Sequence, residues 1–332
     1  MAGSERADPG AEPRSRETGG PRELRDAFAA TLVQLGRERA DLVVLDADLN
    51  TSSKTVAFKE RFPARFLQVG IAEQNLFGIA AGLALSGLRP VPSTFAAFAA
   101  RRALDQIAIS ICYPRLPVLI PGSYVGLPTS RAGASHNCIE DIAVMRALPN
   151  MRVADPGDAE ELSGVMRAGI DAGGPVYFRV ARLSVRPLFG PGHRFAWGRG
   201  ETLREGTDVT LFGTGIMSSL CLLAADLLAA ESISAEVVHL GSIKPIDADL
   251  IADSAGRTGC AVTAENASVI GGFGAAVAET LGERCPVPLR RVGVQDRWVD
   301  SGGIDELFSR HRMQPRDIAA AAAAAVLEKR RR

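Results

Sequence analysis

The segment from Phe66 to Phe98 constrains the fold more than any other part of the chain. Residues 66–69 form a short apolar stretch that ends at Gly70, and small or apolar residues then follow at helical spacing up to Leu85. A second apolar stretch, residues 90–94, comes after a short break. A helix this poor in polar groups must be buried against another surface, and parallel strands need such a crossover. The segment therefore predicts a strand–helix–strand unit of a parallel sheet.

Strand and helix segments alternate along the rest of the chain. Strands are expected at 41–45, 117–121, 151–154, 208–212, 235–239 and 261–265, and helices at 21–36, 101–113, 139–148, 217–230, 273–281 and 319–326. Such alternation predicts an α/β fold with parallel sheets covered on both faces. The length of 332 residues suggests about two domains. We expect two doubly wound domains, a first over residues 21–188 and a smaller one over 207–328, joined by a linker at 189–206. A loop without a regular pattern is expected at 122–135.

The composition argues against several classes of protein. The 38 basic and 38 acidic residues cancel, so neither nucleic acid nor an anionic membrane is an expected partner. The five scattered cysteines predict buried free thiols, and the dispersed histidines predict no metal site in this chain. Residues 1–20 are polar without an apolar core, so we expect a disordered tail and no secretory signal. No apolar run has transmembrane length, and we expect a cytoplasmic protein.

Glu73 and a nearby aromatic pair are the first candidates for chemistry. Glu73 stands at the start of the buried helix, where a free carboxylate is costly. Phe95 and Phe98 follow the second strand. Taken singly, Glu73 could complement the helix dipole, and two Phe residues three apart usually pack in a core.

Two further segments offer candidate binding groups. Asp48 follows the strand at 41–45, at the edge where open α/β sheets bind ligands, although it could instead cap the next segment. The Gly-Gly-Phe-Gly turn at 271–274 could bind an anion at a helix start, but tight packing is the favoured interpretation.

In combination, these features resemble a known family. They are similar to the pyrimidine-binding domain of thiamine-diphosphate enzymes, specifically the transketolase family, and the resemblance continues through the final third of the chain. The segments that carry it are V-G-I-A-E-Q-N at 69–75, S-T-F-A-A-F at 93–98, G-A-S-H with its following helix at 133–151, and G-P-V-Y-F-R-V-A-R at 174–182.

The resemblance implies a role for each residue of the first group. Glu73 is expected to contact N1′ of the aminopyrimidine of thiamine diphosphate and to activate that cofactor. Phe98 is expected to stack on the same ring. Phe95 lines the pocket, with a core-only role equally open, and Asp48 matches an acid near the thiazolium side.

The resemblance also implies a substrate site. In sugar-phosphate transketolases an Arg, a Ser and a second Arg hold the substrate phosphate, and these positions match Arg25, Ser52 and Arg182. Two guanidiniums and a hydroxyl suit a phosphate dianion. His136 matches a histidine that contacts the donor's hydroxyl and carbonyl oxygens, and Arg179 is a plausible additional phosphate contact. Taken alone, each of these would more often be a surface or structural residue.

The loop before His136 departs from the family pattern. The family has an acid four residues before this histidine and another histidine further upstream. This chain has Ala132 and, by motif, Gly122 at these places, and the loop looks longer. Because the missing acid normally reads a substrate hydroxyl, the departure leaves open whether ordinary pentose and hexose phosphates are the substrates.

A motif of the family is missing from the sequence. The family binds the diphosphate through Mg²⁺ held by a G-D-G…N motif in a separate N-terminal domain, and no G-D-G occurs here. The chain therefore resembles the C-terminal subunit of a split transketolase. This implies a partner chain that brings the Mg²⁺ ligands, in a heterotetramer with two copies of each chain.

The predicted function is the transfer of a two-carbon ketol unit from a ketose donor, with a phosphate as its expected terminal group, to an aldehyde acceptor. One alternative is the β subunit of a 2-oxo acid dehydrogenase, and another is a biosynthetic enzyme with an unusual acceptor. The Arg25, Ser52 and Arg182 trio favours transketolase over the dehydrogenase. A non-catalytic stabilising or regulatory subunit is the alternative from a different class, against which Glu73 and Phe98 argue.

Overall fold

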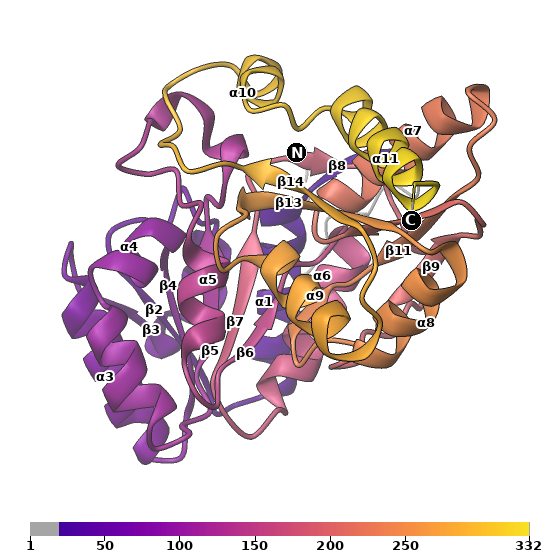
Figure 1. Cartoon of the computed structure of the whole chain (residues 1–332). Helices are drawn as coiled ribbons and strands as arrows, with labels where there is room; N and C mark the ends of the chain where they lie inside the picture. Colours follow the sequence, from indigo (N-terminus) through magenta and orange to yellow (C-terminus); the bar gives the residue numbers. More distant parts are fainter. Residues whose placement is uncertain (1–19, 332) are drawn as a thin grey trace, which may run out of the picture.

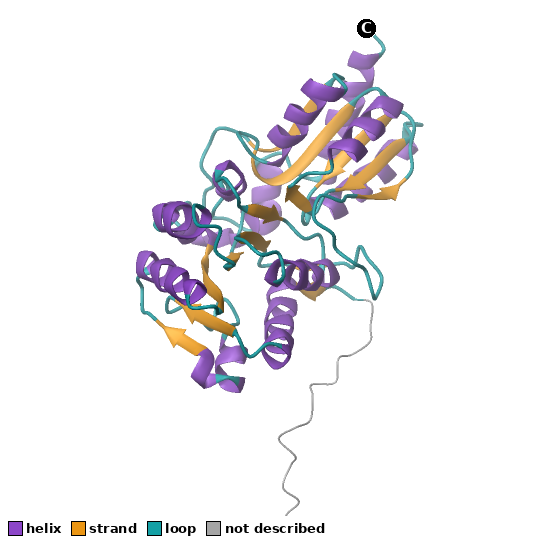
Figure 2. Cartoon of the chain, turned by 90° about the horizontal axis from the view of Figure 1, so that it is seen from below, coloured by secondary structure: helices purple, strands orange, loops and turns teal. Residues whose placement is uncertain are grey.

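The expected strand segments form two mainly parallel sheets in the computed structural model, which describes residues 20–331 (Figure 1). Figure 2 shows the sheets in two lobes, with helices packed around each. The predicted α/β fold class is confirmed. The tail predicted at residues 1–20 lies outside the described residues, apart from Gly20.

The first sheet has seven strands in the order β12-β6-β7-β5-β4-β2-β3. These are β2 (Leu42–Asp46), β3 (Phe66–Gln68), β4 (Arg89–Phe95), β5 (Leu119–Ser123), β6 (Arg152–Ala154), β7 (Val176–Val180) and β12 (Ser242–Lys244). All pair in parallel except β12, which comes from the second half of the chain and runs antiparallel to β6. The helices of this part are α1 (Leu24–Glu38), α2 (Val56–Arg61), α3 (Glu73–Leu85), α4 (Ala96–Arg101), α5 (Asp141–Ala147) and α6 (Ala159–Ile170), with the short helices η1 (Pro63–Arg65), η2 (Gln106–Cys112) and η3 (Leu127–Ala132).

The second sheet has five strands in the order β14-β13-β10-β11-β9. They are β9 (Glu201–Arg204), β10 (Val209–Gly213), β11 (Ala235–His239), β13 (Ala261–Ser268) and β14 (Leu289–Val294), and only β9 is antiparallel to its neighbour. The helices are α7 (Met217–Ala230), α8 (Ala248–Thr258), α9 (Phe273–Arg284), α10 (Ile304–Arg310) and α11 (Pro315–Lys329). A separate pair, β1 (Arg22–Glu23) and β8 (Ser184–Val185), is antiparallel.

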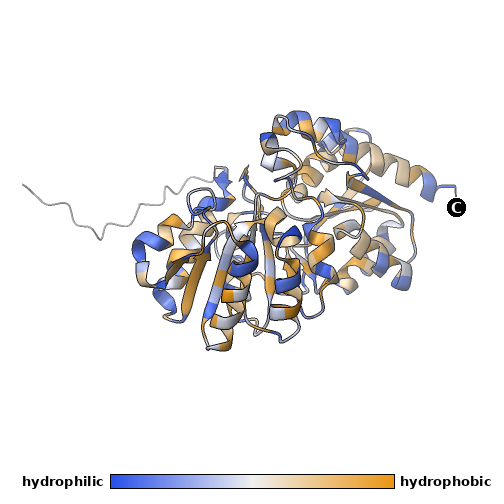
Figure 3. Ribbon diagram, turned by 90° about the vertical axis from the view of Figure 1, so that its left-hand side faces the viewer, coloured by the Kyte–Doolittle hydropathy of each residue, from blue (hydrophilic) through white to orange (hydrophobic). Residues whose placement is uncertain are grey.

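The central strands are hydrophobic along their whole length because both faces of each sheet are covered. Every residue of β2, β5, β7, β10 and β11 is buried. Figure 3 shows this hydrophobic character along the strands, with hydrophilic residues toward the outer helix surfaces. Such strands are typical of parallel sheets. Within residues 20–331, no helix combines the length and the apolar character that crossing a membrane requires.

Three of the segments for which an expectation was stated differ from it. The helix expected at 101–113 is broken: α4 ends at Arg101, and residues 106–112 form the π-helix η2. The loop expected at 122–135 contains the helix η3. Residues 201–204 of the expected linker form β9, which extends the second sheet by pairing with β11.

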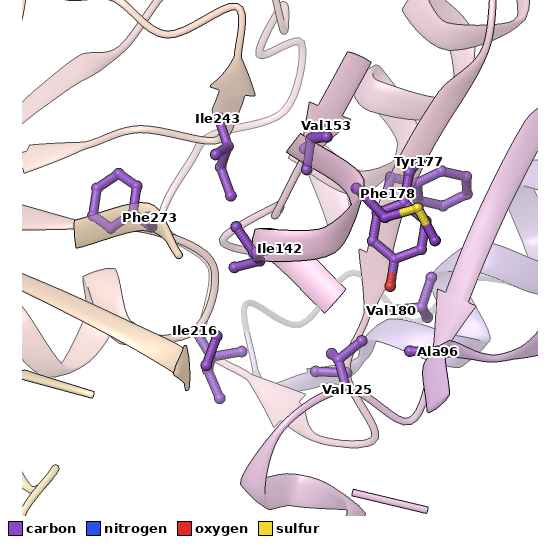
Figure 4. Packing of buried hydrophobic residues seen from close by; sticks show 14 of the residues in the cluster. Ala96, Val125, Ile142, Val153, Tyr177, Phe178, Val180, Ile216, Ile243 and Phe273 are labelled. Carbon is purple, nitrogen blue, oxygen red and sulfur yellow. The ribbon is translucent and has the colours of Figure 1, made fainter. Parts of the chain in front are cut away.

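The two domains share one hydrophobic core. Figure 4 shows Ile142 of α5 among Ile216, Ile243 and Phe273, which belong to the second half of the chain. Because the core crosses the domain boundary, the relative placement of the two sheets is set by packing.

A buried ion cluster at Arg179 also crosses the domain boundary. Arg179 lies in β7 with 1% of its surface exposed, and it donates to Asp141 at 2.8 Å, to Asp155 at 2.9 Å and to the backbone carbonyl of Asn266 at 2.9 Å. Burial lowers the pKa of Arg179, but the two carboxylates outweigh it and hold the pKa above its usual range. Since Arg179 is buried and bound by these groups, its predicted role as a phosphate contact is wrong.

The Gly-Gly-Phe-Gly turn at the start of α9 binds an acidic side chain from within the chain. The two carboxyl oxygens of Glu265 accept hydrogen bonds from the backbone N–H of Phe273 at 2.7 Å and of Gly274 at 2.9 Å. Burial raises the pKa of Glu265 to about 8, against the opposing effect of these two N–H groups. A Cβ atom on Gly272 would lie 2.2 Å from Glu265 Oε2, so the turn is tightly packed, as the favoured interpretation predicted.

Candidate active site

Glu73 is the first residue of α3 and is held by a single side chain. Gly70, with φ of 73°, ends the preceding strand and redirects the chain into α3. The Glu73 carboxylate is 3% exposed, and both of its oxygens accept from Arg102 Nη1 at 3.1 Å. Arg102 is itself 52% exposed. The acid is therefore buried, but its partner reaches it from the solvent side.

An aromatic cluster lies beside this ion pair. Phe95 ends β4, and its ring stacks on Phe98 with 5.6 Å between ring centres. His136 meets both rings edge-on, at 5.9 Å from Phe95 and 5.4 Å from Phe98. Phe95 also stacks on Tyr124 at 4.1 Å. The structure thus brings the three predicted residues Phe95, Phe98 and His136 together and adds Tyr124.

Arg102 connects the aromatic cluster to Glu73. Its guanidinium carbon lies 4.1 Å from the centre of the Phe98 ring, while the same group binds the Glu73 carboxylate. A planar, nitrogen-rich cation thus stacks on Phe98 and donates to Glu73. A planar heterocycle with N–H groups needs the same two neighbours. Two further buried hydroxyls, on Thr94 and Ser123 at the ends of β4 and β5, have no hydrogen-bond partner within residues 20–331. These residues fit an aminopyrimidine ring.

The three predicted phosphate-binding residues meet around Tyr124. Arg25 follows β1 and Arg182 precedes β8. The antiparallel pairing of these two strands therefore brings Arg25 and Arg182 close together. Arg25 Nη1 donates to the backbone carbonyl of Ser52 at 2.9 Å and to the hydroxyl of Tyr124 at 2.9 Å. The guanidinium carbons of Arg25 and Arg182 each lie 5.3 Å from the centre of the Tyr124 ring. We call Arg25, Ser52, Tyr124 and Arg182 the anion end of the site.

Asp48 differs from the other candidates. Its side chain is exposed and, within the described chain, makes no hydrogen bond or ion pair, while its backbone N–H donates to Gln68. The anchored acid of this segment is Asp46, which is fully buried and accepts from Leu49 N at 2.7 Å and Thr55 Oγ1 at 2.9 Å. Asp46 therefore shapes the loop that carries Ser52.

Two family descriptions match this chain. "Transketolase, pyrimidine binding domain" matches residues 21–187, and "Transketolase, C-terminal domain" matches residues 198–318. The chain belongs to the transketolase family. This membership places it among transketolase-type transferases, a family that implies dependence on thiamine diphosphate.

Individual relatives of the transketolase family support this conclusion over nearly the whole chain. The chain is 42% identical to the 6-deoxy-6-sulfo-D-fructose transketolase subunit SqwH of Clostridium sp. (strain MSTE9), over 90% of this chain and 93% of the relative. It is 39% identical to a putative transketolase C-terminal section of Methanocaldococcus jannaschii, over 89% of this chain and 94% of the relative. A solved split-gene transketolase, described as an inactive β4 tetramer, is 46% identical with a TM-score of 0.86, and the match covers 93% of this chain and 100% of that one. The predicted resemblance to the C-terminal subunit of a split transketolase is confirmed.

Sequence reasoning missed Tyr124 as a residue of this transketolase site. The motif alignment put Gly122 at the place of the upstream histidine. In the structure Gly122 faces the core, where a Cβ atom would lie 2.1 Å from Tyr177 Oη. Tyr124 follows β5, at the carboxyl edge where such sheets bind ligands. The expectation that ligands bind at the carboxyl ends of the strands was applied to Asp48 but not to the end of β5. Applied there, it would have indicated Tyr124.

Within residues 20–331, no group of three or more His, Cys, Asp or Glu side chains is placed to hold a metal ion. The two buried carboxylates near the site have separate partners: Glu73 accepts from Arg102, and Asp46 accepts from the backbone of its own loop.

Proposed function

We propose that this chain is the pyrimidine-binding subunit of a two-chain transketolase, which moves a two-carbon ketol unit from a ketose to an aldehyde. The buried Glu73 carboxylate, which the same Arg102 guanidinium joins to the Phe98 ring, is the observation that carries this proposal. The anion end supports the proposal because it is continuous with the aromatic cluster. The Tyr124 ring stacks on Phe95, Phe95 stacks on Phe98, and Phe98 contacts His136. The site can thus hold a cofactor ring at one end and a charged substrate terminus at the other.

The residues of this chain have distinct tasks toward the cofactor. Thiamine diphosphate, when bound, supplies the carbanion and electron-sink chemistry. Glu73 would hold a proton at N1′ of its pyrimidine, and Phe98 would stack on the ring. A carboxyl group shielded from water suits this task, since its interactions are strong and its position is fixed. His136 is placed to donate to or accept from substrate oxygens next to the same rings.

Arg102 must give up both contacts before a cofactor ring stacks on Phe98. Its side chain is half-exposed, so it can move into solvent without unfolding α4. Until then it compensates the buried charge of Glu73, which would otherwise lack a partner. We therefore assign to Arg102 the role of a removable counter-ion in the chain without cofactor.

A partner subunit is expected to cover the surface next to Glu73. Large apolar side chains are exposed on or beside α3 and η2, which packs against α3: Ile71 (76%) just before α3, Ile109 (62%) in η2, Tyr113 (82%) just after η2, and Leu85 (72%) at the end of α3 away from Glu73. Large apolar side chains left exposed along two packed helices mark an interaction surface. We propose that an N-terminal transketolase subunit binds here and brings the diphosphate and Mg²⁺ ligands, in a heterotetramer with two copies of each chain.

The description of the similar split-gene transketolase as an inactive β4 tetramer supports the need for such a partner. The name of the relative SqwH supports a ketose substrate that ends in an anionic group. A phosphate or a sulfonate terminus would both meet the guanidiniums of Arg25 and Arg182.

A reconstituted assay tests the proposal. The chain is co-purified with the N-terminal transketolase subunit of the same organism, and ketol transfer is followed with ketose donors and a panel of aldehydes. We expect transfer only with both chains, thiamine diphosphate and Mg²⁺. A complex containing Glu73→Ala that keeps full turnover would show instead that this chain only stabilises its partner.

A further inference from the structure

The anion end contains a carboxylate that the family resemblance did not imply. Glu23, the last residue of β1, contacts Arg25 through Oε1, which accepts from both Nε and Nη2 of the guanidinium. The other nitrogen of Arg25 is bound to Ser52 and Tyr124. Glu23 therefore occupies the face of Arg25 that would otherwise take two oxygens of a substrate anion.

The position of Glu23 is fixed by the backbone. Glu23 pairs with Ser184 in the two-stranded ribbon, and the N–H of the next residue, Leu24, donates to the carbonyl of Leu183 at 3.2 Å. The Glu23 side chain is 24% exposed, and Arg25 is 11% exposed. The carboxylate thus stays beside the anion end as long as the ribbon is formed.

The anion end, together with Glu23, has a net charge of +1. Arg25 and Arg182 contribute two positive charges, and Glu23 removes one. The next charges along the same segments, Asp26 and Lys54, pair with each other at 3.1 Å and cancel. In contrast to Arg25, Arg182 has no hydrogen-bonded or ion-paired partner within residues 20–331, and its guanidinium lies over the Tyr124 ring. One guanidinium is free for a ligand, and the other is already neutralised.

We infer that Glu23 makes the anion end select a singly charged terminal group, of the sulfonate class, over a phosphate dianion. A sulfonate carries one negative charge, which matches the net charge of the site. A phosphate monoester carries about −1.5 to −2 near pH 7, so its additional charge faces Glu23 at close range. Like charges placed together disfavour the wrong ligand, and this is a common basis of specificity. The inference rests on the proposed function, in which the anion end binds the substrate terminus.

Two ligands that differ only at the terminus test this inference. Dissociation constants of D-fructose 6-phosphate and 6-deoxy-6-sulfo-D-fructose are measured for the full chain by ligand-detected NMR titration, so that no turnover is needed. We expect the wild-type chain to prefer the sulfonate. In Glu23→Gln the ratio of the two constants should shift toward the phosphate by about tenfold. Glu60→Gln, on the exposed surface of α2, is the matched control and should leave the ratio unchanged.

Each other outcome has a defined meaning. A wild-type preference for the phosphate, an unchanged ratio in Glu23→Gln, or no binding of either ligand overturns the inference. Glu23→Ser, which also removes the charge, replaces Glu23→Gln if that variant does not fold. A shifted ratio together with no ketol transfer in the reconstituted complex would leave the inference standing and reject the proposed function.

Discussion

Two ion pairs of the first domain show how a site differs from a structural contact. Arg179 is fully buried and bound by Asp141, Asp155 and a backbone carbonyl, so it cannot leave without unfolding the domain boundary. Arg102 is half-exposed and, among residues 20–331, is the one side chain that binds the Glu73 carboxylate. Both pairs neutralise a buried charge. Only in the Arg102–Glu73 pair does the buried group have a partner that a ligand can replace.

The largest expected effect separates the activity of Glu73 from its contribution to stability. Glu73→Gln keeps the shape of the side chain and removes the acid. Ketol transfer by the assembled enzyme should fall by about 10²- to 10⁴-fold, the usual contribution of a placed acid or base. The free energy of unfolding should stay within about 1 kcal/mol, since the partner is half-exposed. A large loss of stability would place Glu73 in the same class as Arg179.

Arg179→Met should show the opposite behaviour. Removing this cation leaves Asp141 and Asp155 buried without their partner, which typically costs about 3–5 kcal/mol. Urea unfolding of the full chain measures the loss. Arg167→Met, at an exposed pair with Glu38, is the control and should cost less than about 1 kcal/mol. If the two variants lose equal stability, the domain boundary does not depend on the Arg179 cluster.

Another buried acid, Glu265, is expected to make the stability of the fold depend on pH. Its pKa of about 8 lies above the ordinary value of 4.5, because burial favours the protonated form. The folded chain therefore holds a proton that the unfolded chain releases above pH 4.5. This contribution to stability is complete below pH 4.5 and is lost as the pH rises to about 8.

Glu265→Gln should remove that pH dependence. The wild-type free energy of unfolding should lose up to about 1.4 kcal/mol per pH unit from this group, and the variant should show a flatter profile. Unfolding in urea at several pH values between 5 and 8 provides the measurement. Identical slopes in both proteins would mean that Glu265 is ionised in the fold.

The smallest expected effect concerns Arg102. Arg102→Ala leaves the buried Glu73 without its counter-ion and should lower the free energy of unfolding by about 1–3 kcal/mol. In a Glu73→Gln background the same substitution should cost less, because only the Phe98 contact and a neutral hydrogen bond remain, and the double-mutant cycle isolates the charged part of the pair. Equal costs in both backgrounds would show that the two groups do not interact in solution.

The sequence was sufficient for much of the fold because the central strands are apolar throughout and the helices between them have clear periods. The helices α6 and α8 were missed, although each has a capping Asp whose side chain accepts from the residue three positions later: Asp158 from Glu161 N, and Asp247 from Leu250 N. The break after α4 was missed because the apolar pattern of the π-helix looks like that of an α-helix.

For the site, motif matching found residues that lie together in the structure. Glu73, Phe98 and His136 gather at one end, and Arg25 and Arg182 at the other. Besides Tyr124, sequence reasoning did not find Arg102 and Glu23, which owe their roles to tertiary contacts. Nothing in the spacing indicates that Arg102 turns back onto the helix start, or that pairing of β1 with β8 brings Glu23 to the anion end.

Binding of thiamine diphosphate tests the central claim most directly, since this chain is argued to supply the pyrimidine half of a shared site. The cofactor is titrated with Mg²⁺ by calorimetry into the assembled two-chain complex, into each chain alone, and into a complex containing Phe98→Ala. We predict tight binding only by the wild-type complex and clear weakening by Phe98→Ala. Equal affinity in the Phe98→Ala complex, or full affinity of the partner chain alone, would contradict the account.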